Sequence, residues 1–427
     1  MSNVPHAAHP DAIAEEMERR RRRSAPLTGI VLSGGGARGA YEAGILRYIR
    51  DELPPKVRAH ARFEIVCGTS VGAINGCFLA ANAHQPELQG RAISQVWERL
   101  RIEGVYRVGW KELKNLPRFL LGSRGRGQLD DAVGVGRLGG LLNTAPLEQL
   151  IARGMRWNNI KRNLETGDLY ALAINATHIA SGKTHTFVQR QGGGLPPWST
   201  DPQVEARAVT IGPHHTLASA AIPWIFPAVD IDGDVYCDGG LKLNTPISPA
   251  LRLGADRILV IGLRHEEEDQ PDGARVEQFP SAAFLLGKIL NALMNDKTEY
   301  DLNRLRRFNA ILEAGEQAFG DTFTDALGNV LTPMRGAPYR KVQTLMIRPR
   351  QDMASIANKH ARMGSVAARA GGLVGPLIRR LGETADNSES DLLSYLLFDG
   401  EYAADLVRMG MRDADAHRQD LIDFFQV

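Results

Sequence analysis

A serine flanked by glycines is the first group in this chain with the spacing of a nucleophile. Ser70 lies between Gly68 and Gly72 in the segment GTSVG. The apolar segment 63–67 before it and the apolar segment 71–82 after it predict a strand, a sharp turn and a helix. Small residues two positions either side of a serine relieve the clash between such a strand and helix, so the hydroxyl stays accessible. A plain glycine-rich loop is the alternative, and the flanking elements favour the nucleophile.

A second cluster, SGGGARG, also lies between a predicted strand and a predicted helix. Its members are Gly34, Gly35, Gly36, Arg38 and Gly39. Consecutive glycines let several backbone N–H groups converge, and a helix N-terminus adds positive potential, which suits an oxyanion or a phosphate. The same glycines match G-x-G-x-x-G, the dinucleotide fingerprint. That fingerprint also needs an acidic residue about 20 positions on, at the end of the next strand. No acidic residue stands there, so a nucleotide cofactor is the weaker interpretation.

A third motif, Asp238-Gly239-Gly240, follows the predicted strand that ends at Cys237. An aspartate before two glycines is commonly just a turn. In an open parallel sheet, however, sites gather at the carboxyl ends of the strands. All three motifs follow predicted strands, so we expect them to meet at one edge of the sheet.

The elements that position these motifs alternate between strand and helix. Two successive strand–helix units, beginning near residues 27 and 63, predict a parallel sheet with helices on its faces. The fold predicted is a three-layer α/β/α domain with a mainly parallel central sheet, followed by a largely helical C-terminal region. The segment KVQTLMIRP in that region is expected to be a strand that rejoins the sheet. The predicted boundaries are 1–26 for a flexible basic tail, 27–264 for the catalytic domain and 265–427 for the helical region.

Composition narrows the function classes. The chain has 427 residues, of which 43% are hydrophobic, and a formal net charge of +2. Such a balance gives no reason to expect nucleic acid as a partner. The three cysteines have no zinc-site spacing and form no disulfide framework, which favours a reducing, cytoplasmic compartment. No secretory signal pattern and no membrane-spanning apolar segment is predicted, so membrane contact is expected to be peripheral.

Taken in order, the three motifs resemble the patatin-like phospholipases. The set GGGARG, GTSVG and DGG, with ASAAIPWIFPAV just before DGG, carries the resemblance over about residues 27–263. It implies that Ser70 is the nucleophile and Asp238 its base. It also implies an oxyanion hole with these members: Gly34, Gly35, Gly36 and, beside them, Arg38. Many members of the family begin the glycine motif with aspartate where this chain has Ser33, and we expect little effect because backbone amides would face the oxyanion.

The resemblance implies a two-step acyl transfer without metal or cofactor. The expected substrates are fatty-acyl esters of phospholipids or lysophospholipids. Two alternatives remain: a neutral lipase or thioesterase with the same Ser-Asp dyad, and a catalytically silent lipid-binding protein. The presence of both Ser70 and Asp238 argues against the silent protein.

Histidines offer a competing base. A Ser…Asp…His order, as in α/β-hydrolases, would use His265 or His360. The histidines that follow the serine and enter this comparison are His178, His185, His214, His215, His265 and His360. We favour the dyad and expect these histidines to have structural roles.

Two further segments are candidates for covering the site. The loose, glycine- and arginine-containing stretch 102–143 is expected to be an insertion beside the site, with a lid as one role. Aromatic and basic residues mix between Trp97 and Arg118. Such a mixture fits an interfacial patch on phospholipid or, equally, a face that is half core and half solvent.

Overall fold

The computed structural model of the protein describes residues 25–107, 137–138, 140–198, 201–265, 298–335, 339–363 and 389–426, with the single positions 366 and 375. The predictions for the basic tail and for most of the 102–143 insertion fall outside these residues.

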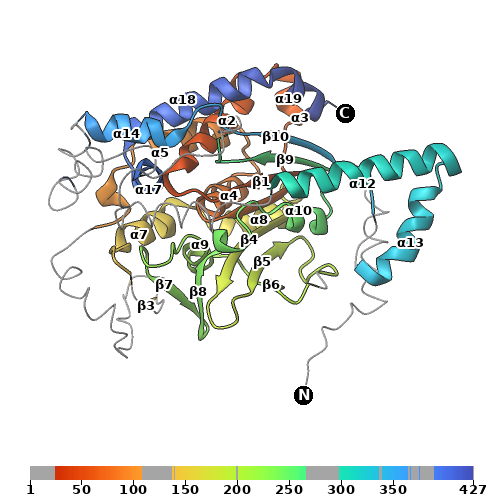
Figure 1. Ribbon diagram of the computed structural model, residues 1–427, viewed down its shortest axis with the longest axis horizontal. Coiled ribbons are helices and arrows are strands. Elements are labelled where there is room, and N and C mark those ends of the chain that lie inside the picture. The colour runs from red at the N-terminus through yellow and green to blue at the C-terminus, as the bar shows by residue number, and fades with distance from the viewer. Residues whose placement is uncertain are drawn as a thin grey trace, which may run out of the picture.

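One mixed sheet organises the described part of the chain (Figure 1). Its parallel centre contains, in spatial order, β10 (Gln343–Ile347), β9 (Arg257–Ile261), β1 (Thr28–Leu32), β2 (Ile65–Thr69) and β4 (Ala171–His178). Antiparallel pairs extend it through β8 (Asp234–Asp238), β7 (Ala228–Ile231) and β3 (Arg137–Leu138). On the other side of β4 lie β5 (Thr184–Arg190), antiparallel to it, and β6 (Val204–Ala208), parallel to β5.

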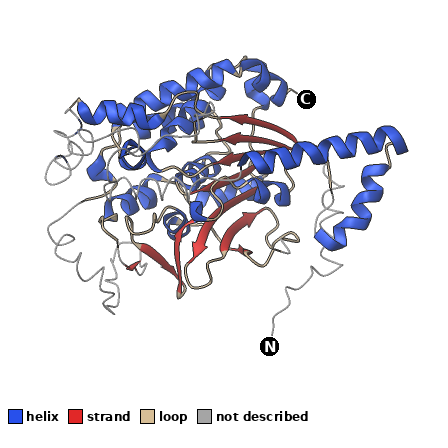
Figure 2. Cartoon of the chain, viewed as in Figure 1, coloured by secondary structure: helices blue, strands red, loops and turns tan. Residues whose placement is uncertain are grey.

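Helices cover both faces, as the alternation of side chains along each strand requires. On β1, Ile30 and Leu32 join one hydrophobic cluster, whereas Val31 joins another on the opposite face. The first cluster contains residues of α2 (Ala40–Asp51), α4 (Val71–Ala81), α5 (Leu88–Glu98) and α18 (Gly400–Ala416). The second contains residues of α10 (Ile247–Leu253) and α12 (Thr298–Phe319). The predicted three-layer α/β/α fold is therefore confirmed (Figure 2).

Shorter helices fill the connections. They are η1 (Gly36–Gly39), α3 (Pro55–His60), η2 (Ile102–Gly104), α7 (Ala145–Gly154), α8 (Asn158–Thr166), α9 (Pro213–Ser219) and η3 (Gly239–Leu241). The C-terminal part adds α13 (Phe323–Arg335), α14 (Met353–Arg362), α17 (Glu389–Leu396) and α19 (Arg418–Phe425).

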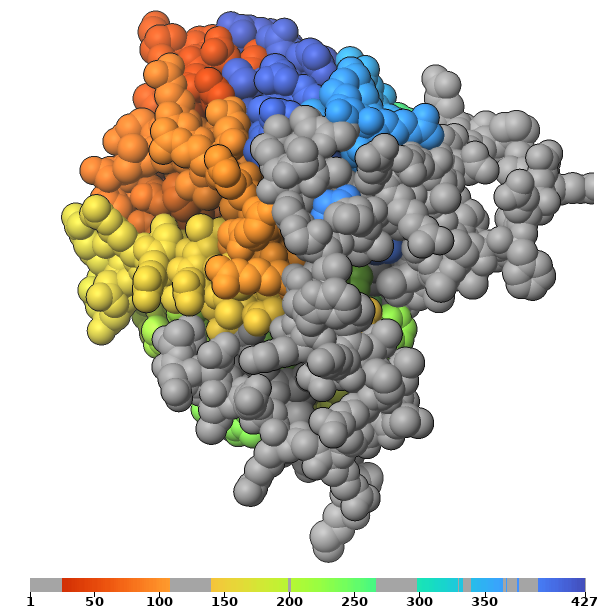
Figure 3. All heavy atoms as spheres, turned by 90° about the vertical axis from the view of Figure 1, so that its left-hand side faces the viewer, coloured from red at the N-terminus to blue at the C-terminus, as the bar shows by residue number. Residues whose placement is uncertain are grey.

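The C-terminal elements pack into the same core as the N-terminal ones. Strand β10 pairs with β9, so the segment KVQTLMIRP rejoins the sheet as expected. Helix α18 lies against α2 so closely that a Cβ at Gly44 would meet the Val407 carbonyl oxygen at 2.2 Å. Figure 3 shows these N- and C-terminal residues, coloured red and blue, as neighbours on one face. The boundary between 264 and 265 stays a prediction.

Strand β4 brings the two chemical motifs together because two different strands, β2 and β8, pair with successive parts of the same edge of β4. Thr69, the last residue of β2, is opposite Asn175, and Asp238, the last residue of β8, is opposite the next residue, Ala176. The strand that ends at Asp238 is not one of the parallel strands of the sheet. β8 runs antiparallel to β4, so the ends of β2 and β8 approach each other from opposite directions.

Candidate active site

Ser70 occupies the sharp turn between β2 and α4, with φ 55° and ψ −124°. Positive φ is uncommon for a residue other than glycine and costs conformational energy. A Cβ at Gly68 would lie 2.2 Å from the Gly72 carbonyl oxygen, and one at Gly72 would lie 2.3 Å from the Leu32 carbonyl oxygen. The strand and the helix thus cross too closely for side chains at these positions. This is the physical reason for the spacing of the GTSVG motif.

The hydroxyl of Ser70 donates a hydrogen bond to Asp238 Oδ2 at 2.6 Å. Both side chains are buried, with exposed fractions of 2% for Ser70 and 0% for Asp238. The other carboxylate oxygen, Oδ1, accepts a bond from the Gly240 amide at 2.7 Å. One carboxylate oxygen is therefore held by the backbone while the other faces the serine. That geometry allows direct transfer of the serine proton.

The environment of Asp238 makes its carboxylate unusually basic. Burial raises the pKa of Asp238 from 3.8 to about 7, although the hydrogen bonds from Ser70 and Gly240 lower it in part. Loss of hydration penalises the charged form more than these two bonds stabilise it. A carboxyl group with a pKa near neutrality is suited to accept and return a proton at physiological pH.

A layer of polar groups behind the pair holds it in place. Ser219 Oγ accepts from the Ser70 amide at 2.9 Å and donates to the Asn175 carbonyl at 2.6 Å. Thr177 Oγ donates to the Asp238 carbonyl at 2.9 Å. Sequence reasoning missed these residues. Asn175 and Thr177 did carry a signal, because they interrupt an otherwise apolar strand.

The glycine-rich loop offers two backbone donors rather than three. The Gly34 amide donates to the Asn244 carbonyl at 3.1 Å, and Asn244 Nδ2 donates back to the Gly34 carbonyl at 3.2 Å. The amide that the resemblance assigned to the oxyanion is therefore already bonded. No bond joins the amides of Gly35 and Gly36 to another residue in the part of the chain that the structure describes. These two amides remain the candidates for an oxyanion hole.

Arg38 was expected beside the oxyanion hole, but its guanidinium contacts α17 instead. It donates to Ser394 Oγ at 2.8 Å and to Asp391 Oδ1 at 3.1 Å. The side chain that the resemblance assigned beside the oxyanion hole therefore contacts a helix more than 350 positions further along the chain.

The remaining motif glycines permit close packing. A Cβ at Gly39 would meet Val71 Cγ2 at 2.3 Å, and one at Gly239 would meet the Asn175 carbonyl oxygen at 2.2 Å. Gly39 thus brings the glycine loop onto α4, and Gly239 brings the aspartate turn onto β4.

The six histidines have partners away from the pair. His178 bonds Ser181, His185 bonds Tyr236, His265 bonds Pro349 and His360 bonds Asp405. His215 Nδ1 accepts a hydrogen bond from the Gly212 amide, and the His214 ring lies tilted against the His215 ring with centres 4.0 Å apart. Among the described residues, none of the hydrogen bonds to Ser70 or Asp238 comes from a histidine. The arrangement favours a carboxylate as the base.

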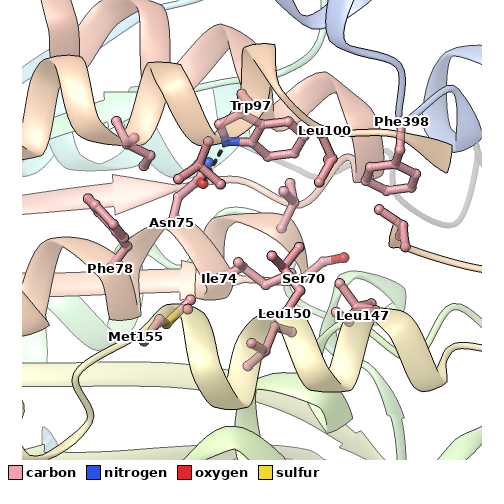
Figure 4. Close-up of a pocket in the computed structure, with 18 of the residues that line it drawn as sticks. Ser70, Ile74, Asn75, Phe78, Trp97, Leu100, Leu147, Leu150, Met155 and Phe398 are labelled. Atoms are coloured by element: carbon pink, nitrogen blue, oxygen red, sulfur yellow. Dashed lines mark hydrogen bonds between the residues drawn. The ribbon is translucent and has the colours of Figure 1, made fainter. Parts of the chain in front are cut away.

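An apolar cavity of about 130 Å³ begins at Ser70 and Gly36. Ser70, Ile74 and Phe78 lie on one side of α4, and α7 contributes Leu147 among others (Figure 4). Ser70 and Phe78 are eight positions apart in the sequence, which corresponds to ~12 Å along a helix. The remaining lining residues are Val71, Asn75, Ile93, Val96, Trp97, Leu100, Val105, Leu150, Ile151, Gly154, Met155, Ala220, Ile222, Phe226 and Phe398. A narrow apolar space next to the serine is suited to a hydrocarbon chain.

One wall of the cavity contains a buried polar group. Asn75 Nδ2 donates to Glu42 Oε2 at 2.7 Å, and Trp97 Nε1 donates to Asn75 Oδ1 at 3.1 Å. Burial raises the pKa of Glu42 well above its usual value.

Trp97 and Tyr106 are both buried. They are core residues and not part of an interfacial patch, and the rest of that predicted patch, from residue 108 onward, lies outside the described residues.

The described residues contain no group of three or more His, Cys, Asp or Glu side chains arranged to hold a metal ion. No helix among these residues has the length and apolar character needed to cross a membrane.

A strained serine turn, a buried aspartate that accepts a hydrogen bond from this serine and an apolar cavity beside them lie together in a three-layer α/β/α fold. The profile of the patatin-like phospholipase family matches residues 30–251, about half of the chain. The chain belongs to the patatin-like phospholipase family.

Two curated relatives and one solved structure match different shares of the chain. A cGAMP-activated phospholipase of Pseudomonas aeruginosa is 28% identical over 218 residues, which are 51% of this chain and 53% of that protein. A lysophospholipase of Aspergillus terreus is 36% identical over 72 residues, 17% of this chain and 4% of that protein. The crystal structure of VipD from Legionella pneumophila matches 92% of this chain and 67% of its own, with 13% identity and a TM-score of 0.31. The chain thus spans about half the length of the first relative and a small part of the second.

Proposed function

We propose that this chain is a serine acyl hydrolase that cleaves fatty-acyl esters of phospholipids or lysophospholipids. The observation that carries the proposal is the 2.6 Å hydrogen bond from Ser70 to the buried Asp238, at the end of an apolar cavity. Membership of the patatin-like phospholipase family supports the same reaction class.

In the first half of the reaction, Asp238 Oδ2 accepts the proton of the Ser70 hydroxyl as the serine oxygen attacks the ester carbonyl carbon. The carbonyl oxygen becomes an oxyanion, which the amides of Gly35 and Gly36 stabilise. When the tetrahedral intermediate collapses, the carbon–oxygen bond to the leaving alcohol breaks. The alcohol leaves with the proton that Asp238 held, and the acyl group stays on Ser70.

In the second half, a water molecule attacks the acyl-serine ester. Asp238 accepts one proton of that water, and the same two amides stabilise the second oxyanion. Collapse of this intermediate breaks the bond to Ser70, which regains its proton from Asp238. The products of this half are a fatty acid and the free enzyme, and the proposed steps use no metal or organic cofactor.

The cavity supports a lipid acyl chain as the group on the carbonyl side. Its lining is almost entirely apolar, so burying a chain there is favoured by ~0.8 kcal/mol for each methylene. The Pseudomonas and Aspergillus relatives are named as a phospholipase and a lysophospholipase, which agrees with this substrate class.

The direct test is a comparison of products from mixed phospholipids and lysophospholipids between the wild-type protein and Ser70→Ala. Fatty acid should be released only by the wild-type protein. Labelling with a fluorophosphonate should occur at Ser70 and nowhere else. A protein that binds lipid but neither hydrolyses it nor becomes labelled would be the silent alternative, and the proposal would fail.

The same assay separates the related hydrolases. Triacylglycerol and acyl thioesters, offered beside phospholipids, distinguish a neutral lipase or a thioesterase, because both would use the same dyad. The name of the Pseudomonas relative says that it is activated by cGAMP. Each substrate should therefore be measured with and without cGAMP, so that an inactive resting state is not mistaken for a silent protein.

We also propose a peripheral contact with the lipid surface near the cavity. Trp224 is 52% exposed and has φ 64°, a strained conformation for a tryptophan. It lies between Ile222 and Phe226, which line the cavity. Trp224→Ala should therefore reduce hydrolysis of lipid in vesicles while leaving hydrolysis of a soluble ester unchanged. Equal rates of Trp224→Ala and the wild-type protein on vesicles would contradict this contact.

A further inference from the structure

The Arg38 side chain is buried, and its hydrogen bonds go to residues of a single helix, α17. Its exposed fraction is 6%. Nε and Nη2 donate to Ser394 Oγ at 2.8 and 2.6 Å, and Nη2 also forms an ion pair with Asp391 at 3.1 Å. The guanidinium carbon lies 4.1 Å from the centre of the Tyr395 ring, within cation–π range. All three partners belong to α17, so the contact is a built site and not a chance surface pair.

Helix α17 also touches the glycine loop through its backbone. A Cβ at Gly36 would lie 2.2 Å from the Tyr395 carbonyl oxygen, and Gly36 has φ 56°. No side chain fits between the loop and the helix at this point. The position of α17 therefore limits where the Gly36 backbone can lie.

The helix is itself fixed to the catalytic part of the chain. Tyr106 donates to the Leu396 carbonyl at 2.9 Å. Phe398, just after the helix, stacks on Trp97 with ring centres 6.3 Å apart and lines the acyl cavity. The Asp399 side chain then accepts from the Glu401 amide at 3.0 Å and caps α18. The end of α17 and the residues that follow it are thus attached to Tyr106 and Trp97.

Hydrogen bonds therefore hold the glycine loop at both of its ends. At one end, Asn244 exchanges two hydrogen bonds with Gly34. At the other, Arg38 is clamped to α17. The two amides available for an oxyanion, those of Gly35 and Gly36, lie between these fixed points. Donors held rigidly in advance stabilise a developing charge far better than donors that must reorganise.

We propose that Arg38 is a positioning residue whose clamp on Asp391 and Ser394 of α17 holds the Gly35 and Gly36 amides in the geometry of an oxyanion hole. The inference rests on the proposed function, because it assigns a role within that reaction. It also gives the C-terminal part of the chain a role in catalysis. Helix α17 contacts the donor loop and not the reacting atoms.

The test uses the full-length chain and changes the clamp from the α17 side. The variants are Ser394→Ala, Asp391→Asn and the double change, with Arg38→Lys as the conservative variant and Arg38→Gln as the loss of charge. Asp405→Asn is the matched control. Asp405 also bonds a basic side chain, that of His360 at 2.7 Å, but it lies on α18, and its hydrogen bonds among the described residues go to His360 and Arg408 and not to the glycine loop.

Two readouts separate positioning from general weakening of the fold. The first is kcat and KM on a soluble short-chain ester. The second is the affinity for an alkyl boronic acid, whose boron bonds to the Ser70 oxygen while Asp238 takes the hydroxyl proton. That adduct places an oxygen in the oxyanion position. Circular dichroism and thermal unfolding confirm that each variant is folded, and Ser394→Ala is mild enough to report alone if Asp391→Asn unfolds.

We expect the double variant to lose about tenfold to a hundredfold in kcat with little change in KM, since a misplacement of about 1 Å can cost that much. Boronate affinity should fall by the same factor. Arg38→Lys should retain part of the activity that Arg38→Gln loses, and Asp405→Asn should match the wild type.

Folded clamp variants with wild-type kcat and boronate affinity would overturn the inference. A rise in kcat would also overturn it, because α17 would then be a restraint on the site. A wild-type chain with neither turnover nor labelling of Ser70 would contradict the proposed function itself and this inference with it. An active wild type with unaffected clamp variants contradicts only the clamp.

Discussion

The buried carboxylate of Asp238 should control both the rate and the stability of the protein, and with opposite signs. As a base, Asp238 must be ionised before it can accept the Ser70 proton. Burial raises its pKa to about 7. The kcat/KM of the wild-type chain should therefore rise with pH and level off above an inflection near 7. One pH unit below that inflection, about a tenth of the molecules carry the ionised base.

The same shift destabilises the folded state at neutral pH. A pKa that moves from 3.8 to about 7 on folding corresponds to ~4 kcal/mol. Below pH 3.8 the carboxyl is protonated in both states, so there is no penalty. Between about pH 4 and 7 the unfolded chain is ionised while the folded chain is not. Stability should fall over this window as pH rises, and the full penalty remains above pH 7.

Asp238→Asn removes the charge and keeps the shape. It should lower turnover about a thousandfold or more, the scale typical of losing a catalytic group. It should also raise the free energy of unfolding above that of the wild type at pH 8, by up to ~4 kcal/mol, with the difference vanishing near pH 4. Denaturant unfolding of both proteins at pH 4, 6 and 8, beside their pH–rate profiles, measures the two effects together.

Histidines titrate in the same range, so single changes of the six histidines are the necessary control. Each should leave turnover and the inflection in place. If one histidine change removes the inflection or costs a thousandfold in turnover, a triad replaces the dyad. If Asp238→Asn is no more stable than the wild type at pH 8, burial of the charged carboxylate does not lower the free energy of unfolding. The raised pKa of Asp238 would then need another cause.

Three other results are expected. Gly35→Ala should lose about a hundred- to thousandfold in turnover on a short-chain ester, the scale of one oxyanion donor, while circular dichroism shows a folded protein. The added Cβ would lie 2.6 Å from Leu263 Cδ1, the end of a flexible side chain that can move, so the variant is expected to fold. Near-normal turnover of the folded variant would remove this loop from the mechanism. Hydrolysis should survive EDTA, and activity that is lost to the chelator and restored by calcium would show a metal requirement. Ile74→Trp should block the cavity between Ser70 and Phe78, so long-chain esters should lose at least about tenfold in kcat/KM relative to short-chain esters, a change of ~1.4 kcal/mol; an unchanged ratio would place the acyl chain elsewhere.

The sequence predicted best what depends on neighbouring residues. The serine turn follows from two glycines and the flanking strand and helix, all within 63–82, and the structure has the strand, the turn and the helix there. The three-layer fold follows from the alternation of strands and helices. In both cases the signal lies within one short segment, where local sterics and hydrophobic periodicity decide the outcome.

What the sequence left open depends on distant partners. The aspartate motif gives no sign that β8 runs antiparallel to β4, because direction is set by how the chain returns to the sheet. Arg38 matches its motif, yet the segment that binds its side chain lies more than 350 positions away. The hydrogen bond from the Gly34 amide to the Asn244 carbonyl, which occupies one of the expected oxyanion donors, is another long-range contact. Periodicity and motif spacing contain no information about such pairings.

The two glycines after Asp238 connect the local motif to the chemistry. A base that replaces histidine needs a pKa near neutrality, and for a carboxyl group burial is the direct way to raise it. Burial requires that no side chain hold the turn away from β4, and a Cβ at Gly239 would meet the Asn175 carbonyl oxygen at 2.2 Å. The charged form still needs one fixed hydrogen bond, which the Gly240 amide supplies at 2.7 Å. The DGG motif therefore sets the basicity of the carboxylate through close packing on one side and a single backbone donor on the other.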